Sequence, residues 1–173
     1  MGLNSDLLTL KSDKIILQKV SLNDVGFLLE LLNDPDFITN IGDRGVRTEA
    51  QTQAYLENGV LKQPDYLGLW VIRALDDGRS MGVISVLKRE FLENIDLGYA
   101  LLKSARGRGI ARQAAFLMLS YLTGQKGVRI VDAIVNPNNQ ASINLLSKLN
   151  FTKIGDISTP EHERLKLYRY LNN

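Results

Sequence analysis

The hydrophobic and polar positions of the chain divide its centre into a strand, a short turn and a long helix. From Ile95 to Leu101 every second residue is apolar, which is the spacing of side chains on one face of a β-strand. From Ile110 to Leu122 the apolar period lengthens to three or four residues, which predicts an amphipathic helix. A turn of glycines and arginines at residues 106–109 joins the two. The rest of the chain is organised around this unit.

The same pattern predicts about seven strands and four helices in total. Beside the central strand, strands are expected at residues 14–18, 67–74, 80–87, 127–135, 151–157 and 165–171. Beside the central helix, helices are expected after a capping box at Ser21–Asp24, after a cap at Thr48, and after the break at residues 136–139. Residues 1–9 are expected to form a loose leader, and Asn150 to end the last helix in a left-handed conformation. These elements predict a mixed sheet covered by helices.

Length and composition narrow the class of protein. The 173 residues predict one domain, residues 1–173, with 45% hydrophobic and 23% charged residues as in an ordinary globular protein. A net charge of +2 gives no reason to expect a nucleic-acid partner. No cysteine is present, so disulfides, thiolate metal sites and a cysteine nucleophile are excluded, and no metal is expected. No apolar run has the length of a signal or a membrane span, so we expect a cytoplasmic protein with no membrane partner.

The turn before the central helix has the chemistry of a phosphate site. Gly107 and Gly109 present bare backbone N–H groups beside arginines, at the positive end of the helix dipole. The turn is not a Walker loop, because neither Lys-Ser nor Lys-Thr follows the second glycine. It is not a dinucleotide fingerprint either, because Arg112 stands where that motif needs Gly or Ala. A glycine-rich turn with solvated arginines is the alternative interpretation.

Three ordered blocks of sequence carry a family resemblance. Asp-Leu-Gly-Tyr at residues 96–99 precedes the Arg-x-x-Gly-x-Ala motif at residues 106–111. Asn-Gln-Ala-Ser at residues 139–142 and Lys-Leu-Asn-Phe at residues 148–151 follow. In order and spacing the blocks resemble those of the GNAT (Gcn5-related) N-acetyltransferases, an acyl-CoA-dependent superfamily, and in particular its ribosomal-protein N-terminal acetyltransferase (RimJ/RimL-like) branch.

The resemblance implies an α+β (mixed α/β) fold with a mostly antiparallel twisted sheet. Its central strands, at residues 95–102 and 128–135, would splay apart to form an acyl-CoA cleft. The implied cofactor is acetyl-CoA, with CoA as product. Backbone groups of Leu101 and Leu102 would pair with the pantetheine arm. The remaining implied cofactor-binding residues are Arg106, Gly107, Arg108, Gly109, Ile110, Ala111, Arg112, Asn139 and Ser142, with Asn139 alternatively a plain helix cap.

Acetyl transfer to an amine needs one group that removes a proton and another that protonates the departing thiolate. Asp96 matches the family's acidic position, and its alternatives are a strand-end cap or a partner for an arginine. A water molecule or His162, the single histidine, is another candidate base, although His162 is otherwise a solvated loop residue. For the acid, many relatives have a tyrosine where Leu146 stands here. Ser142 instead matches the serine of the ribosomal-protein branch, and is otherwise a hydroxyl bonded to the helix backbone.

We therefore predict an acetyl-CoA-dependent N-acetyltransferase in which a primary amine attacks the thioester directly. The acceptor is a protein N-terminal α-amine or a small-molecule amine, and a pKa of about 8 favours the α-amine over a lysine at about 10.4. Two other hypotheses are a non-catalytic acyl-CoA-binding or sensing module and a nucleotide-phosphate binder unrelated to CoA. Tyr99 and Tyr121 are expected in the core. The identity of the acceptor, the preferred acyl chain and the pairing of two chains as a homodimer stay open.

Overall fold

The computed structural model describes residues 8–161 and 163–173, which contain one eight-stranded sheet. The strand order is β1-β2-β3-β4-β5-β6-β8-β7, and every neighbouring pair is antiparallel except β5 and β6. The strands are β1 (Thr9–Lys11), β2 (Ile15–Lys19), β3 (Gly68–Ala74), β4 (Ser80–Leu87), β5 (Asp96–Leu101), β6 (Ile130–Val135), β7 (Thr152–Ser158) and β8 (Arg164–Leu171).

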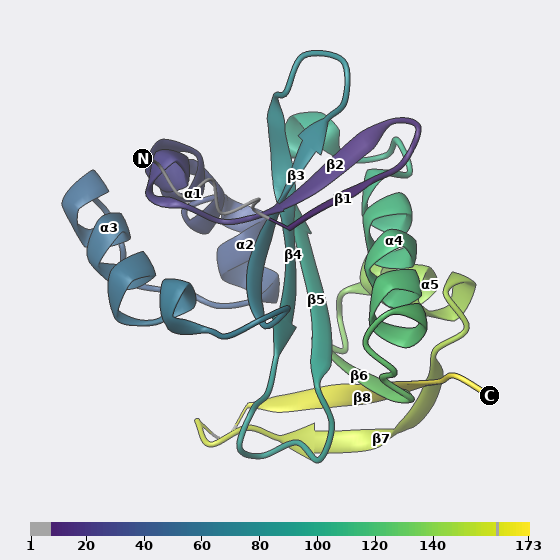
Figure 1. The fold of residues 1–173 in the computed structure, drawn as a ribbon. Helices are drawn as coiled ribbons and strands as arrows, with labels where there is room; N and C mark the ends of the chain where they lie inside the picture. The colour runs from purple at the N-terminus through teal and green to yellow at the C-terminus, as the bar shows by residue number, and fades with distance from the viewer. Residues whose placement is uncertain (1–7, 162) are drawn as a thin grey trace.

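Helices cover both faces of this sheet (Figure 1). The first face carries α1 (Val25–Leu32), α2 (Pro35–Asn40) and α3 (Glu49–Asn58), and the opposite face carries α4 (Ile110–Gly124) and α5 (Gln140–Lys148). Short 3₁₀ turns lie at Leu22–Asp24, Val60–Lys62 and Lys103–Ala105. None of the helices in the described ranges has the length and apolar character needed to span a membrane.

Two hydrophobic clusters, one on each face, hold the layers together. Between the sheet and α4, Trp70 is fully buried and its ring meets that of Tyr121 edge to face at 6.1 Å. Between the sheet and α1–α3, Leu28 and Leu56 pack with Val71. Since both faces are covered, β3 and β4 are nearly continuous runs of buried side chains rather than alternating ones.

Local signals in the sequence placed most element ends correctly. The capping box at Ser21 forms, Thr48 caps α3, and α4 begins at Ile110. Asn150 has the expected left-handed conformation, with φ of 65°. These ends were predictable because caps and left-handed termini depend on residues within one helical turn.

Two elements were missed, which is why the expected counts are too low. The predicted leader lies outside the described residues at 1–7, but Thr9 begins β1 and pairs with Gln18. No helix was expected between the one that follows Ser21–Asp24 and the one that follows Thr48, yet Pro35 starts α2, where the Asp34 side chain accepts hydrogen bonds from the N–H groups of Asp36 and Phe37. Proline suits the first turn of a helix because its missing N–H is not needed there.

The feature that positions the site is the divergence of β5 from β6. These strands share a single register pair, Asp96 with Asp132, whereas β4–β5 and β6–β8 each share six. The predicted splayed pair of central strands is therefore confirmed. Between Asp96 and its C-terminal end, β5 has no partner strand on the edge that faces β6.

Candidate functional site

The free edge of β5 carries unpaired backbone groups. The Leu102 N–H donates to the Met81 carbonyl at 2.9 Å, and the Leu102 carbonyl accepts from Ala105, so both Leu102 groups are used within the protein. Because successive residues of a strand direct their backbone groups to opposite edges, those of Tyr99 and Leu101 point toward the gap beside β6. The Leu101 carbonyl is occupied by the Arg106 guanidinium at 2.9 Å, which leaves the Leu101 N–H and the Tyr99 groups at this edge.

At the end of this edge, α4 begins with an uncapped turn. Gly107 and Gly109 have φ of 73° and 74°, a left-handed conformation that favours glycine. Gly109 is the N-cap and no side chain caps the helix. The first backbone hydrogen bond runs from the Gln113 N–H to the Gly109 carbonyl, so the amides of Ile110 to Arg112 have no helical acceptor. This is the bare-amide arrangement that the sequence predicted.

Arg106, the first residue of the predicted motif, is held by the protein itself. Its guanidinium pairs with Asp34 at 2.7 Å and with Asp36, and donates to the Leu101 carbonyl. Its own N–H donates to Lys103. The side chain thus ties the turn before α4 to the start of α2, and Arg108 by contrast is exposed.

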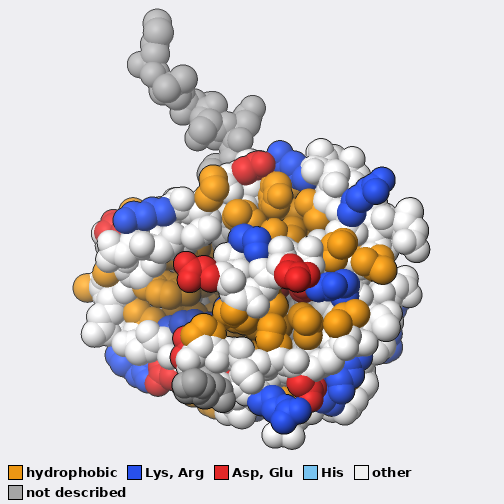
Figure 2. All heavy atoms as spheres, turned by 90° about the horizontal axis from the view of Figure 1, so that it is seen from below, with side chains coloured by type: hydrophobic (Ala, Val, Ile, Leu, Met, Phe, Trp, Pro, Cys, Tyr) orange, Lys and Arg blue, Asp and Glu red, His pale blue; other side chains and the backbone are white. Residues whose placement is uncertain are grey.

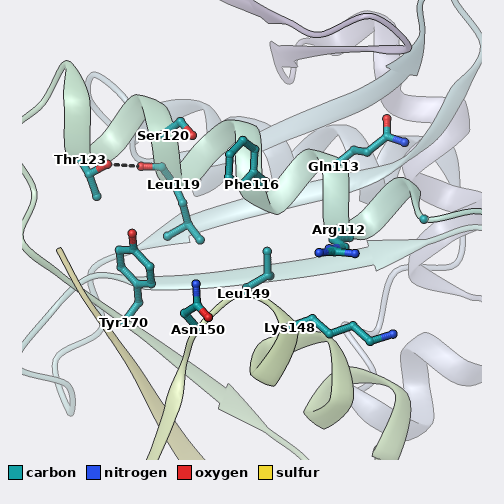
Figure 3. Close-up of a pocket in the computed structure, with 11 residues that line it drawn as sticks. Arg112, Gln113, Phe116, Leu119, Ser120, Thr123, Lys148, Leu149, Asn150 and Tyr170 are labelled. Atoms are coloured by element: carbon teal, nitrogen blue, oxygen red, sulfur yellow. Dashed lines mark hydrogen bonds between the residues drawn. The ribbon is translucent and has the colours of Figure 1, made fainter.

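A groove of about 620 Å³ runs along the outer side of α4 from Gly109 (Figure 3). Arg112 points into the space between α4 and the C-terminal end of α5, where Lys148 also lies. Phe116 lies along the same side of α4 and is 66% exposed, the most exposed of the large hydrophobic residues among those described. The groove is lined by Gly109, Arg112, Gln113, Phe116, Leu119, Ser120, Thr123, Lys148, Leu149, Asn150 and Tyr170.

A second hollow, of about 610 Å³, lies on the opposite face of the sheet. It is formed by the end of α1, the start of α2 and the segment that follows β5. Its lining residues are Glu30, Asn33, Asp34, Pro35, Leu102, Lys103 and Ser104. The two hollows therefore lie on opposite faces of the sheet, one beside the start of α4 and one beside the segment that follows β5. Seen from the end where β7 and β8 lie, the surface shows hydrophobic side chains gathered among acidic and basic ones (Figure 2).

Two buried carboxylates meet at the single β5–β6 pair. Asp96 is 1% exposed and accepts from the Arg89 Nε at 3.1 Å. Asp132 is 0% exposed and accepts from Arg169 through two bonds, of 2.7 and 3.1 Å. Burial raises the pKa of Asp96 above its ordinary value, the charge of Asp132 adds to this, and the nearby Arg89 opposes it. A carboxylate with a raised pKa accepts a proton more readily than an ordinary one.

Sequence analysis did not single out Asp132. The available signal was a lone carboxylate inside the apolar run of residues 128–135, which is costly unless the charge is paired. Its partner Arg169 lies 37 positions away on β8, and Asn94 supplies a further hydrogen bond at 3.2 Å. Asp96 also has the alternative role that the sequence allowed, because it forms an ion pair with Arg89. This ion pair does not test whether Asp96 takes part in the chemistry.

On the other side of the gap, the start of α5 meets β5 through Ser142 and Tyr99. Asn139 is the N-cap of α5 and accepts from the Ser142 N–H at 3.2 Å. The Tyr99 hydroxyl lies 2.8 Å from Ser142 Oγ. Tyr121 is buried as expected, but Tyr99 is only partly buried and its hydroxyl reaches across to α5. Sequence analysis placed Tyr99 in the core and missed this contact.

The side chains of Asp96 and Tyr99 lie on opposite faces of the sheet, because side chains alternate along β5. Leu97, Tyr99 and Leu101 belong to the cluster beneath α4, whereas Ala100 packs against the α1–α3 cluster. Asp96 has the parity of Ala100, so its side chain faces the side of α1–α3 and Tyr99 faces the side of α4. The Asp96 carboxylate and the Tyr99–Ser142 pair of hydroxyls thus lie on opposite faces of the sheet. The described residues contain no cluster of ligands suited to a metal ion, and His162 lies outside the described residues.

Comparisons with known proteins agree with this architecture. The family profile of the acetyltransferase (GNAT) domain matches residues 14–152. A Bacillus subtilis protein described as a probable N-acetyltransferase, YjcK, is 28% identical over 127 residues, which cover 72% of this chain and 66% of that one. The uncharacterised YkkB of the same organism is 27% identical over 145 residues, covering 81% and 83%.

Solved structures share the fold at low sequence identity. A GNAT-family acetyltransferase from Bacillus anthracis superposes with a TM-score of 0.79 at 18% identity, covering 95% of this chain and 98% of that one. RimL, described as a ribosomal L7/L12 alpha-N-protein acetyltransferase in complex with coenzyme A, superposes with a TM-score of 0.82 at 19% identity, covering 95% and 98%. The splayed strands, the uncapped turn of α4 and the match over residues 14–152 lead to one conclusion: this chain belongs to the GNAT family and is an acetyltransferase.

Proposed function

We propose that this protein transfers an acetyl group from acetyl-CoA to a primary amine, either a protein N-terminal α-amine or a small-molecule amine. The observation that carries the proposal is the uncapped first turn of α4 at the end of the unpaired edge of β5. Together these features offer hydrogen-bond donors to a diphosphate and a strand edge to an amide-bearing arm. We place the reaction in the cytoplasm, as the sequence predicts.

The residues of the gap fit CoA in two parts. The amides of residues 107–112 donate to the pyrophosphate, where the left-handed glycines let the backbone approach without a side chain. The Leu101 N–H and the Tyr99 backbone groups pair with the pantetheine amides, while Leu102, whose groups are used internally, shapes the wall. Arg106 serves by fixing the turn, and Asn139 and Ser142 close the gap from α5.

The thioester supplies an activated acyl group, so the protein needs only to align the amine and manage two protons. Asp96 accepts a proton from the amine, directly or through water, from the α1–α3 side. Ser142 donates to the departing sulphur from the α4 side. A base and an acid on opposite faces of the sheet do not neutralise each other, so Asp96 can act on the amine nitrogen while Ser142 acts on the sulphur.

Glu30, Asp34 and Lys103 line the second hollow and Asp34 is already paired with Arg106, so the charges there do not distinguish one acceptor from another. RimL, a structural neighbour, is described as acting on the N-terminus of a ribosomal protein. We therefore place a free peptide N-terminus first among acceptors and a small amine second.

The decisive experiment measures thiol release from acetyl-CoA with a panel of free-N-terminus peptides and polyamines, with mass spectrometry to locate the acetyl group. Acceptor-dependent release supports the proposal. Stoichiometric CoA binding without turnover on any amine would support the sensor hypothesis instead. Competition by ATP far better than by CoA would support a nucleotide-phosphate binder.

The groove beside α4 is expected to hold the nucleotide end of CoA, because it starts at Gly109 and presents Arg112 and Lys148 around the exposed ring of Phe116. The double variant Arg112→Gln, Lys148→Gln should weaken CoA binding by about tenfold and dephospho-CoA binding by less than about twofold. Isothermal titration with both ligands measures the difference.

The matched control is Lys126→Gln, which removes a lysine near the far end of α4 whose partner is Asp65. It should leave both affinities unchanged. Equal losses for CoA and dephospho-CoA in the groove variant would place the 3′-phosphate elsewhere.

A further inference from the structure

The hydroxyl of Tyr99 lies at the gap, and the reaction described so far does not use it. We propose that Tyr99 is a positioning residue: its hydroxyl donates a hydrogen bond to Ser142 Oγ and so leaves the Ser142 proton free to point at the departing sulphur. The inference rests on the proposed acetyl transfer and adds a residue to it.

The geometry permits this direction for the bond. Tyr99 Oη lies 2.8 Å from Ser142 Oγ, where either hydroxyl can be the donor, and 3.2 Å from the Ser142 carbonyl oxygen, to which the Tyr99 hydroxyl can also donate. We assign the Tyr99 proton to the shorter contact, because 2.8 Å is the ordinary length of a hydroxyl–hydroxyl bond. With the Tyr99 proton on Oγ, the Ser142 proton cannot be directed at Tyr99 and is available to another acceptor.

Other hydroxyls on the helices behave differently. Thr52, Thr123 and Ser147 each donate to the backbone carbonyl four residues earlier, at 2.8 to 3.2 Å. This is the default for a serine or threonine in a helix. Ser142 instead has a tyrosine from a different element, 43 positions away in sequence, as its partner. The partner of Ser142 Oγ is therefore a side chain of β5 and not a carbonyl of its own helix.

Tyr99 is suited to be a persistent donor. Burial raises the pKa of Tyr99 to about 12, although the bond to Ser142 opposes the shift. The phenol therefore keeps its proton at neutral pH. Its side chain projects from β5 and packs against the hydrophobic core, so the position of its hydroxyl is fixed by the sheet.

The amine nitrogen forms a bond to the acetyl carbon, the carbon–sulphur bond breaks, and its electron pair stays on sulphur. Asp96 takes the proton lost by the nitrogen and passes it to water. Ser142 gives its proton to sulphur while Tyr99 keeps its own and holds Ser142 Oγ by the hydrogen bond, and Ser142 regains a proton from water. One proton leaves the amine and one joins the thiol, so nothing else is required.

The first test measures binding rather than turnover. CoA bound to the protein is titrated by the ultraviolet absorbance of its thiolate, in the wild type, Tyr99→Phe and Ser142→Ala. If both hydroxyls act on the sulphur, Tyr99→Phe and Ser142→Ala should each raise the pKa of the bound thiol by about one unit. Affinity for CoA at neutral pH should change by less than about threefold. An unchanged thiol pKa in Tyr99→Phe would overturn the proposal.

The second test asks whether the two residues act as a unit. Tyr99→Phe should lower kcat about tenfold with an unchanged KM for acetyl-CoA, and the double variant with Ser142→Ala should be no slower than Ser142→Ala alone. Additive losses would mean that Tyr99 acts independently of Ser142 and would contradict the inference. Tyr121→Phe, a buried tyrosine on α4, is the control for loss of a hydroxyl and should leave both kcat and the thiol pKa unchanged.

The two proposals fail in different ways. A wild-type protein that binds no CoA, or releases no thiol with any amine, contradicts the acetyltransferase proposal itself. A wild type that turns over normally, with Tyr99→Phe indistinguishable from it in both tests, contradicts only the role of Tyr99. Melting temperatures of all variants confirm that the comparison is between folded proteins, and Ser142→Ala keeps the test informative if Tyr99→Phe proves unstable.

Discussion

Replacing Asp96 with asparagine should lower kcat by about 1,000-fold, which is within the range expected for removing a general base. The substitution keeps the size of the side chain and removes its capacity to accept a proton. The Arg89 guanidinium, already about one-third exposed, then turns to solvent, so the fold should survive. Steady-state rates at neutral pH with the best acceptor of the panel measure the effect.

The dependence of kcat/KM on pH is a second test of Asp96 as the base. Asp96 must be ionised to accept a proton, and its pKa lies above the ordinary aspartate value because of burial and the Asp132 charge. The wild-type kcat/KM should therefore be level above that pKa and fall tenfold per pH unit below it, at a pH higher than about 3.9. In Asp96→Asn this acid limb should vanish. A limb that persists unchanged would assign it to another group.

Asp132→Asn is the matched control, because it removes the other buried carboxylate of the β5–β6 pair. It leaves the Arg169 guanidinium without its bidentate partner, so we expect a loss of stability of about 3 kcal/mol. Its kcat should stay within about tenfold of the wild type. Equal losses of rate in both variants would mean that the pair serves the sheet and not the chemistry.

Replacing Gly109 with valine should weaken CoA binding by about 100-fold. At φ of 74° a β-branched residue is strained by about 1–2 kcal/mol, and relief of that strain turns the amides of the α4 turn away from a bound anion. The protein offers no atom within 4 Å of an added Cβ at this position, so no clash with the fold itself is expected. Titration of CoA into the variant measures the loss.

Gly127→Val is the control that distinguishes a loss of CoA binding from a loss of stability caused by backbone strain. Gly127 has φ of 67° and equally open surroundings, but it lies beyond the far end of α4, away from the turn. It should lose similar stability and keep its CoA affinity. A Gly109→Val protein with normal affinity would contradict the diphosphate site at the start of α4.

The parts of the site that the sequence predicted are those made by neighbours in the chain. The turn at residues 106–111 needs only two glycines and a following helix, so its conformation could be anticipated from residue types. The splay of β5 and β6 was anticipated from the family resemblance, because a strand pattern by itself does not show where pairing stops.

The parts that could not be predicted depend on contacts between distant positions. The partners of Arg106 are 70 and 72 positions away on α2, and nothing local distinguishes a guanidinium that binds phosphate from one that ties two elements together. Tyr99 alternates with apolar residues and so was assigned to the core, although its polar end reaches α5. An amphipathic tyrosine gives the same periodicity whether its hydroxyl is satisfied by water or by a reacting group.

The single register pair between β5 and β6 also affects how firmly the two parts of the sheet are connected. Besides this pair, the Asn94–Asp132 hydrogen bond and the helices packed on the sheet connect β1 to β5 with β6 to β8. If the pantetheine arm lies along β5 as proposed, it would add backbone hydrogen bonds along this unpaired edge. Its release would remove these bonds again, so the connection between the two groups of strands would change in each catalytic cycle.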